Sequence, residues 1–198
     1  VDFQNSHHHD FQAVAPESRD ACCDAVSEMI ARRLEPSAIE ILDRLTIEAV
    51  EDSVYAAGYP REASAVLLVE VDGAAPAVRG ISDEVIEVFG RHGALETRRA
   101  ATAEERLALW AGRKGAFGAM GRVAPDLYVA DAVVPRTKLR QLVRRTVEIA
   151  AKHRLKLATV FHAGDGNLHP NICYDRRDED ETRRVVEAGE EILTACVE

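Results

Sequence analysis

Two histidines on either side of a short turn are the residues of this chain best suited to chemistry. The segment from Thr159 to Asn171 contains two short runs joined at Asp165-Gly166, a dipeptide that favours a two-residue hairpin turn. Folding the segment about that turn places His162 directly opposite His169 on one face of a sheet. The Cβ atoms of such a pair lie roughly 4.5–5.5 Å apart. Two imidazoles at that spacing could share a metal ion or hold one substrate molecule.

Asn171 lies two residues past His169 and therefore points to the same side of its strand. The turn thus presents His162, His169 and Asn171 as one polar cluster. The alternative is that Asp165-Gly166 only makes a turn, which the histidines cap. A metal site would need more than these two nitrogens, since a catalytic zinc usually takes three protein ligands. A third ligand would have to be a carboxylate, or lie outside this chain.

A second candidate is the glycine-rich stretch at residues 110–122. Its glycines let the backbone approach another surface closely, although each weakens a helix by about 1 kcal/mol relative to alanine. Arg113 and Lys114 could bind an anion there, and arginine binds a carboxylate through two parallel hydrogen bonds. The stretch is neither a P-loop nor a dinucleotide-binding fingerprint. The alternative is an ordinary helix with a solvated basic end.

Composition excludes several classes of protein. The chain has 198 residues, a formal charge of −9 and 46% hydrophobic residues, which is typical of a globular protein. The negative charge and the lack of a basic, aromatic stripe argue against nucleic acid as a partner. No apolar run approaches the roughly 18 residues of a membrane span. The four cysteines lack metal-site spacing and indicate a reducing compartment, so the expected location is the cytoplasm.

The pattern along the chain predicts a tail followed by one domain. Residues 1–10, which include His7-His8-His9, are interpreted as a tag-like or disordered tail and are excluded from the site, whereas residues 11–198 form the domain. Besides the hairpin, strands are expected at 11–15, 37–43, 65–72, 94–99 and 126–134. Helices are expected from residue 16, at 46–57, 76–91, from 102 to 110 or beyond, at 137–153 and from 178 onward.

This alternation would ordinarily suggest a doubly wound parallel sheet. The strand-to-helix turns lack a glycine-rich phosphate loop, however, and a hairpin requires antiparallel pairing. We therefore favour an α+β fold, a ferredoxin-like antiparallel sheet with helices packed on one face.

The sequence HAGDGNLHPN at 162–171 resembles the signature of the C-terminal domain of FAD-linked oxidases in the vanillyl-alcohol oxidase superfamily. Within that group the chain is most similar to glycolate oxidase FAD subunits and D-lactate dehydrogenases. The resemblance extends over most of the chain. Further matching segments, in family order, are 40–44, 67–73, Trp110 with Arg113-Lys114, and 131–135.

The resemblance implies a substrate-binding cap domain of an FAD-dependent 2-hydroxyacid dehydrogenase or oxidase of the glycolate or D-lactate type. It implies that His162 and His169 are catalytic and bind a divalent metal, Zn or Mn, in metal-dependent members. Arg113 would pair with the substrate carboxylate, and Asn171 would contact the substrate. FAD would be bound mainly by the protein's own N-terminal FAD-binding domain, which is absent from this chain, and other redox subunits are further expected partners.

The chain also departs from the family pattern. Val129 replaces a lysine that some members carry, which gives a dicarboxylate substrate less support. The family's later Glu-His-Gly segment, with a further metal ligand and a catalytic histidine, does not occur before Glu198. We therefore expect a truncated domain that is inactive alone. The alternatives are a stand-alone ferredoxin-like module that binds a metal or an anion, and an interaction subunit of a larger redox complex.

Overall fold

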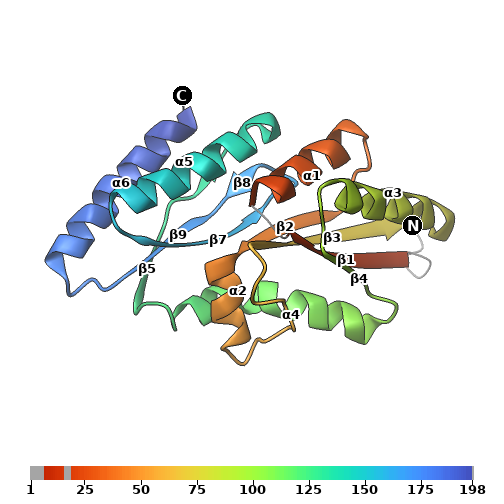
Figure 1. Cartoon of the computed structure of the whole chain (residues 1–198), viewed down its shortest axis with the longest axis horizontal. Coiled ribbons are helices and arrows are strands. Elements are labelled where there is room, and N and C mark those ends of the chain that lie inside the picture. The colour runs from red at the N-terminus through yellow and green to blue at the C-terminus, as the bar shows by residue number, and fades with distance from the viewer. Residues whose placement is uncertain (1–6, 16–18, 198) are drawn as a thin grey trace.

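The computed structural model of the chain describes residues 7–15 and 19–197, in which helices alternate with strands (Figure 1). The helices are α1 (Arg19–Ala31), α2 (Arg44–Glu51), α3 (Ala75–Arg91), α4 (Ala103–Met120), α5 (Leu139–Lys152) and α6 (Glu179–Val197). The strands are β1 (His7–Ala15), β2 (Ala38–Asp43), β3 (Ala65–Gly73), β4 (Glu96–Arg99), β5 (Asp126–Val129), β6 (Ala132–Val133), β7 (Lys156–His162), β8 (Asn167–Leu168) and β9 (Pro170–Tyr174).

The strands pair antiparallel in a sheet with two parts. The first part has the order β4-β1-β3-β2, and the second consists of β7, β8 with β6, and β9 with β5. β2 and β7 join the parts through three residue pairs, Glu40 with His162, Ile41 with Phe161, and Leu42 with Val160. We call this junction the seam. It is short compared with the nine pairs between β1 and β3.

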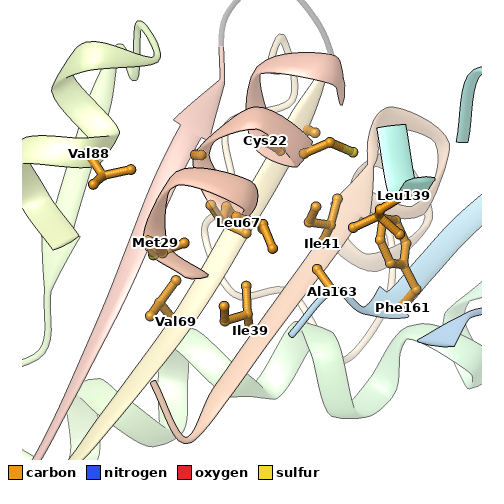
Figure 2. Close-up of a cluster of buried hydrophobic side chains, with 14 of the residues drawn as sticks. Cys22, Met29, Ile39, Ile41, Leu67, Val69, Val88, Leu139, Phe161 and Ala163 are labelled. Carbon is orange, nitrogen blue, oxygen red and sulfur yellow. The ribbon is translucent and has the colours of Figure 1, made fainter. Parts of the chain in front are cut away.

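Helices cover both faces of this sheet. α1, α3 and α5 lie on one face, whereas α2 and α4 lie on the other (Figure 1). Figure 2 shows the core of the first face, in which Cys22 and Met29 of α1 pack over Ile41, Leu67 and their neighbours. The next residues along the strands, which include Leu42 after Ile41 and Leu68 after Leu67, point to the other face. With Val160 of β7, they pack under α2 and α4. The predicted α+β class and antiparallel pairing are confirmed, but the expectation of helices on one face is wrong.

The reason lies in the central strands. β2 is buried from its second residue to its last, and β3 from its first to its fifth. Strands that are apolar on both sides need cover on both sides. A third cluster, which includes Ile149, Ile172 and Ile192, joins α5 and α6 to β9.

Several boundaries differ from those expected. β1 begins at His7 and pairs with β3 along its whole length, so residues 7–10 belong to the sheet and not to a tail. The expected tail at residues 1–6 lies outside the described residues. The predicted strand at 126–134 is divided into β5 and β6. None of the described helices has the length and apolar character of a bilayer-spanning segment.

Candidate functional site

The two predicted histidines lie together beside the seam, on the face of the sheet that carries α4. His162 ends β7, and His169 lies between β8 and β9. Their ring centroids are 5.3 Å apart, and the ring planes cross at 83°. The predicted proximity of the histidines is confirmed.

The register that brings them together is not the predicted one. His162 pairs with Asn167, so residues 163–166 form a four-residue turn. A two-residue turn of the expected type needs positive φ at both Asp165 and Gly166, but only Gly166 has it, with φ 72°. The backbone N–H of Ala163 instead donates to the carbonyl of Ile39. Side chains alternate with a period of two, so a register that differs by two residues still leaves both histidines on one face.

His169 occupies an interruption in the sheet. β8 stops before it and β9 starts after it, while β5 and β6 are interrupted at Ala130 and Asp131 alongside. The Nδ1 atom of His169 lies 2.5 Å from Oδ1 of Asp131. The Asp131 side chain is 68% exposed, whereas that of His169 is 14% exposed. A solvated carboxylate thus orients the second histidine.

A buried carboxylate orients the first histidine. The Oε1 atom of Glu40 lies 2.5 Å from Nδ1 of His162. Its Oε2 atom accepts a hydrogen bond of 2.8 Å from Nε of Arg113. The Glu40 and Arg113 side chains are 7% and 12% exposed. Glu40 therefore connects two residues that the sequence suggested as separate candidates.

α4 carries Arg113 across the face of the sheet. The helix begins with a capping box in which Thr102 and Glu105 each bond the other's backbone, as its sequence predicted. One face of α4 bears Arg106, Trp110, Arg113 and Phe117, spaced four, three and four residues apart. Arg106 pairs with Glu70 of β3 at 3.1 Å. Two arginine–carboxylate pairs thus hold the helix over neighbouring strands.

Asn171 supports His169 from β9. Its Nδ2 atom donates to the backbone carbonyl of His169 at 2.8 Å. The side chain is fully buried, and its Oδ1 atom has no hydrogen-bond partner among the described residues. A buried acceptor without a partner is uncommon in folded proteins and calls for a donor from a ligand or a water molecule.

Apolar side chains border the cluster. The Phe117 ring centroid lies 6.5 Å from that of His169, and Val129 pairs with Asn171 across β5 and β9. Phe117 and Val129 are 41% and 42% exposed. A cavity of about 660 Å³ reaches His162 and Glu40 from the side of Gly164 and Arg136.

Each histidine has a carboxylate at Nδ1, a contact that metal-ligating histidines usually have. A carboxylate on Nδ1 favours the tautomer with its proton there, which leaves the lone pair on Nε2. Among the residues that the structure describes, however, no group of three or more His, Cys, Asp or Glu side chains could hold a metal ion. His162 and His169 provide two donors, and the roles predicted for them, for Arg113 and for Asn171 stay predictions.

The sequence analysis assigned no role to Glu40 or Asp131. The available signal was a lone acid within the apolar run of β2, a position that requires a buried partner. The partners of Glu40 are 73 and 122 residues away, so local patterning could not identify them.

Residues 7–198 match the family model of FAD linked oxidases, C-terminal domain. The chain belongs to this family. Glycolate oxidase subunit GlcD of Escherichia coli is 41% identical over 174 residues, which are 88% of this chain and 35% of that protein. GlcD of Bacillus subtilis is 38% identical over 183 residues, or 92% of this chain and 38% of that protein. A mitochondrial D-lactate dehydrogenase [cytochrome] of Arabidopsis thaliana is 28% identical over 85% of this chain and 29% of its own.

Solved structures share the fold of this FAD-linked oxidase domain. p-Cresol methylhydroxylase aligns with a TM-score of 0.67 at 14% identity, over 95% of this chain and 43% of that one. Alkyldihydroxyacetonephosphate synthase aligns with a TM-score of 0.64 at 12% identity, over 98% of this chain and 39% of that one. The domain spans about a third of the length of the GlcD relatives.

Proposed function

We propose that this domain is the substrate-binding cap of an FAD-dependent enzyme that oxidises a small 2-hydroxyacid of the glycolate or D-lactate type. The observation that carries the proposal is the contact of Arg113 and His162 with one buried carboxylate, beside His169. An arginine suited to a carboxylate and an imidazole suited to a hydroxyl proton are the two groups that a 2-hydroxyacid requires. Homology to glycolate oxidase subunits and D-lactate dehydrogenases supports the same substrate class.

Each residue has a definite part in this proposal. Arg113 binds the substrate carboxylate with its two Nη groups, because its Nε is engaged by Glu40. His162 accepts the hydroxyl proton at Nε2, and the orphan Oδ1 of Asn171 accepts a hydrogen bond from a bound water or ligand. FAD, bound mainly by the N-terminal domain of the complete protein, supplies the acceptor for the hydride.

A divalent metal fits the histidine pair in part. His162 and His169 would hold it through their Nε2 atoms, and a bound metal would polarise the hydroxyl group. Two nitrogens fall short of the three protein ligands that catalytic zinc usually takes. The remaining ligand would come from residues other than those described.

The apolar border favours a small substrate. Val129 and Phe117 offer no cation to a second carboxylate near His169. A hydrogen atom or a methyl group on the α-carbon, as in glycolate or lactate, suits this surrounding better than a charged chain.

The test uses the full-length flavoprotein with glycolate and D-lactate. Arg113→Ala is expected to lower kcat/KM on the order of 100-fold, mainly through KM, since a paired charge is lost. His162→Ala should lose most of kcat. Lys114→Ala is the matched control, because Lys114 is the exposed neighbour of Arg113 and should leave both constants unchanged. Failure of every 2-hydroxyacid to bleach the flavin under anaerobic conditions would rule out the proposed function.

A further inference from the structure

Glu40 is a charged residue within β2, whose only other charged residue is Asp43 at the end of the strand. It is 5% exposed and lies between Ile39 and Ile41, which are 3% and 1% exposed. An ionised carboxylate in such a position is costly unless it is paired and hydrogen-bonded. Each of its two oxygens has one charged or chargeable partner, His162 for Oε1 and Arg113 for Oε2.

This arrangement acts on His162 through its Nδ1 atom. Neutral histidine in water places its proton mostly on Nε2, but a carboxylate 2.5 Å from Nδ1 reverses that preference. The ring then presents an unprotonated Nε2. Only this tautomer can accept a proton or bind a metal at Nε2 without first losing a hydrogen there.

The same carboxylate acts on Arg113 through Nε. A guanidinium held at Nε has a fixed orientation, and its two Nη groups form an edge that can pair with a planar anion through two parallel hydrogen bonds. Arg113 is 12% exposed, so few rotamers are open to it once Glu40 is engaged. One side chain thus contacts both Nδ1 of His162 and Nε of Arg113.

The second histidine provides an internal comparison. Asp131 contacts Nδ1 of His169 at the same 2.5 Å but is 68% exposed. Water screens an exposed carboxylate, whereas a buried one exerts a stronger field on its neighbours. Glu40 is therefore the less hydrated of the two orienting carboxylates, whereas the His162 side chain is 42% exposed.

We propose that Glu40 is a positioning residue, which holds the Nδ1–H tautomer of His162 and the orientation of Arg113 at once. Its effect on catalysis rests on the proposed function, but its effect on the His162 ring does not. The alternative is a purely structural ion pair that ties β2 to α4.

The first experiment measures the tautomer directly. The full-length protein is labelled with ¹⁵N in its histidine rings, and the His162 signals are identified by their loss in His162→Gln. Ring ¹⁵N shifts should show the proton on Nδ1 in the parent protein and a change toward Nε2–H in Glu40→Gln. Asp131→Asn is the matched control, which should change the His169 signals and leave those of His162 in place.

Glu40→Gln leaves Arg113 buried without a counter-charge, so it could unfold the protein. Arg113→Gln is therefore measured as well, because it breaks the ion pair but keeps the contact of Glu40 with His162. Its His162 ring should keep the proton on Nδ1. A change of tautomer in Arg113→Gln equal to that in Glu40→Gln, or no change in a folded Glu40→Gln, would overturn the proposal.

The second experiment measures kinetic coupling with the hydroxyacid. Removing a residue that orients a functional histidine typically costs 10–100-fold in activity, and we expect this loss in kcat/KM for Glu40→Gln. In a His162→Gln background the same change should cost much less, since the two residues act as a unit. If Glu40→Gln lowers kcat/KM by the same factor in both backgrounds, Glu40 does not act through His162, and the proposal is contradicted. A tautomer change in a protein that oxidises no 2-hydroxyacid would instead refute the proposed function and leave the role of Glu40 intact.

Discussion

At the scale of single residues, burial sets the chemistry of the cysteines. Cys22 and Cys23 of α1 and Cys173 of β9 are buried free thiols, whereas Cys196 is partly exposed. Burial raises the pKa of the Cys173 thiol to about 11 and that of Cys23 to about 12. The folded state therefore holds these protons more tightly than the unfolded chain, in which thiols titrate near pH 8.5.

The first prediction concerns alkaline pH. Because the folded pKa values are raised, the stability they contribute is complete below about pH 8.5 and is lost as pH rises through about 11. The free energy of unfolding, measured with urea at pH 7.5, 9 and 10, should fall over this range. Cys173→Ala should be less stable at pH 7.5 but lose less stability at higher pH. Equal dependence of the unfolding free energy on pH in the two proteins would contradict a raised pKa of Cys173.

Site residues were predictable where their neighbours in the sequence determine their position. His162 and His169 lie seven residues apart around one turn, and strand periodicity placed them on one face even though the expected register was two residues off. The partner of each imidazole was not predictable, since Glu40 lies in β2 and Asp131 lies between β5 and β6, both distant from the turn in sequence. Long-range pairing depends on the assembled sheet.

At the scale of elements, the glycines of α4 determine how closely it packs. A Cβ atom at Gly112 would overlap Tyr59, which is 2% exposed, and would lie 2.8 Å from Cγ1 of the fully buried Val50. A Cβ atom at Gly118 would lie 3.2 Å from Cε2 of Tyr55, whose side chain has room to move since Tyr55 is 41% exposed. These glycines allow α2 and the loop that follows it to approach α4 closely.

The second prediction compares two alanine substitutions in α4. Each gains about 1 kcal/mol of helix propensity. In Gly112→Ala, overpacking against side chains that cannot move should exceed this gain and destabilise the protein by about 1–3 kcal/mol net. Gly118→Ala should be neutral or stabilising by up to about 1 kcal/mol. The free energies of unfolding of both variants are measured with urea. Equal values would show that the contact at Gly112 is not tight.

The types of the elements were more predictable than which helices cover which face of the sheet. The capping box at Thr102 and the apolar run of β3 predicted their helix and strand correctly. The same apolar run also carried the information that β3 is buried on both faces, which contradicts helices on one side alone. Local patterns indicate that a face is buried, but which helix covers it depends on the connections between distant segments.

At the scale of the whole molecule, the seam divides the sheet into a part from β1–β4 and a part from β5–β9. Glu40 comes from the first part and both histidines from the second, while α4, which carries Arg113, connects the two along the chain. The proposed substrate site is therefore complete only when both parts are joined. In the proposed function, the flavin is bound mainly by the part of the complete protein that lies outside this domain, which spans 35% of the GlcD relative of Escherichia coli.

The third prediction follows from the proposed separation of substrate binding and flavin binding between two parts of the complete protein. The 198-residue chain, purified alone, should carry no flavin absorbance and should oxidise neither glycolate nor D-lactate when FAD and an artificial acceptor are added. The full-length protein under the same conditions is the positive control. Turnover by the chain alone would show that it binds FAD productively by itself.

The seam also constrains how this sequence can change over time. Glu40 lies 73 residues from Arg113 and 122 residues from His162, yet both contact its buried carboxylate. A neutral residue at position 40 would make a charged residue at position 113 unfavourable, so acceptable replacements there depend on each other. In an alignment of related sequences, these three distant columns should therefore vary together or not at all.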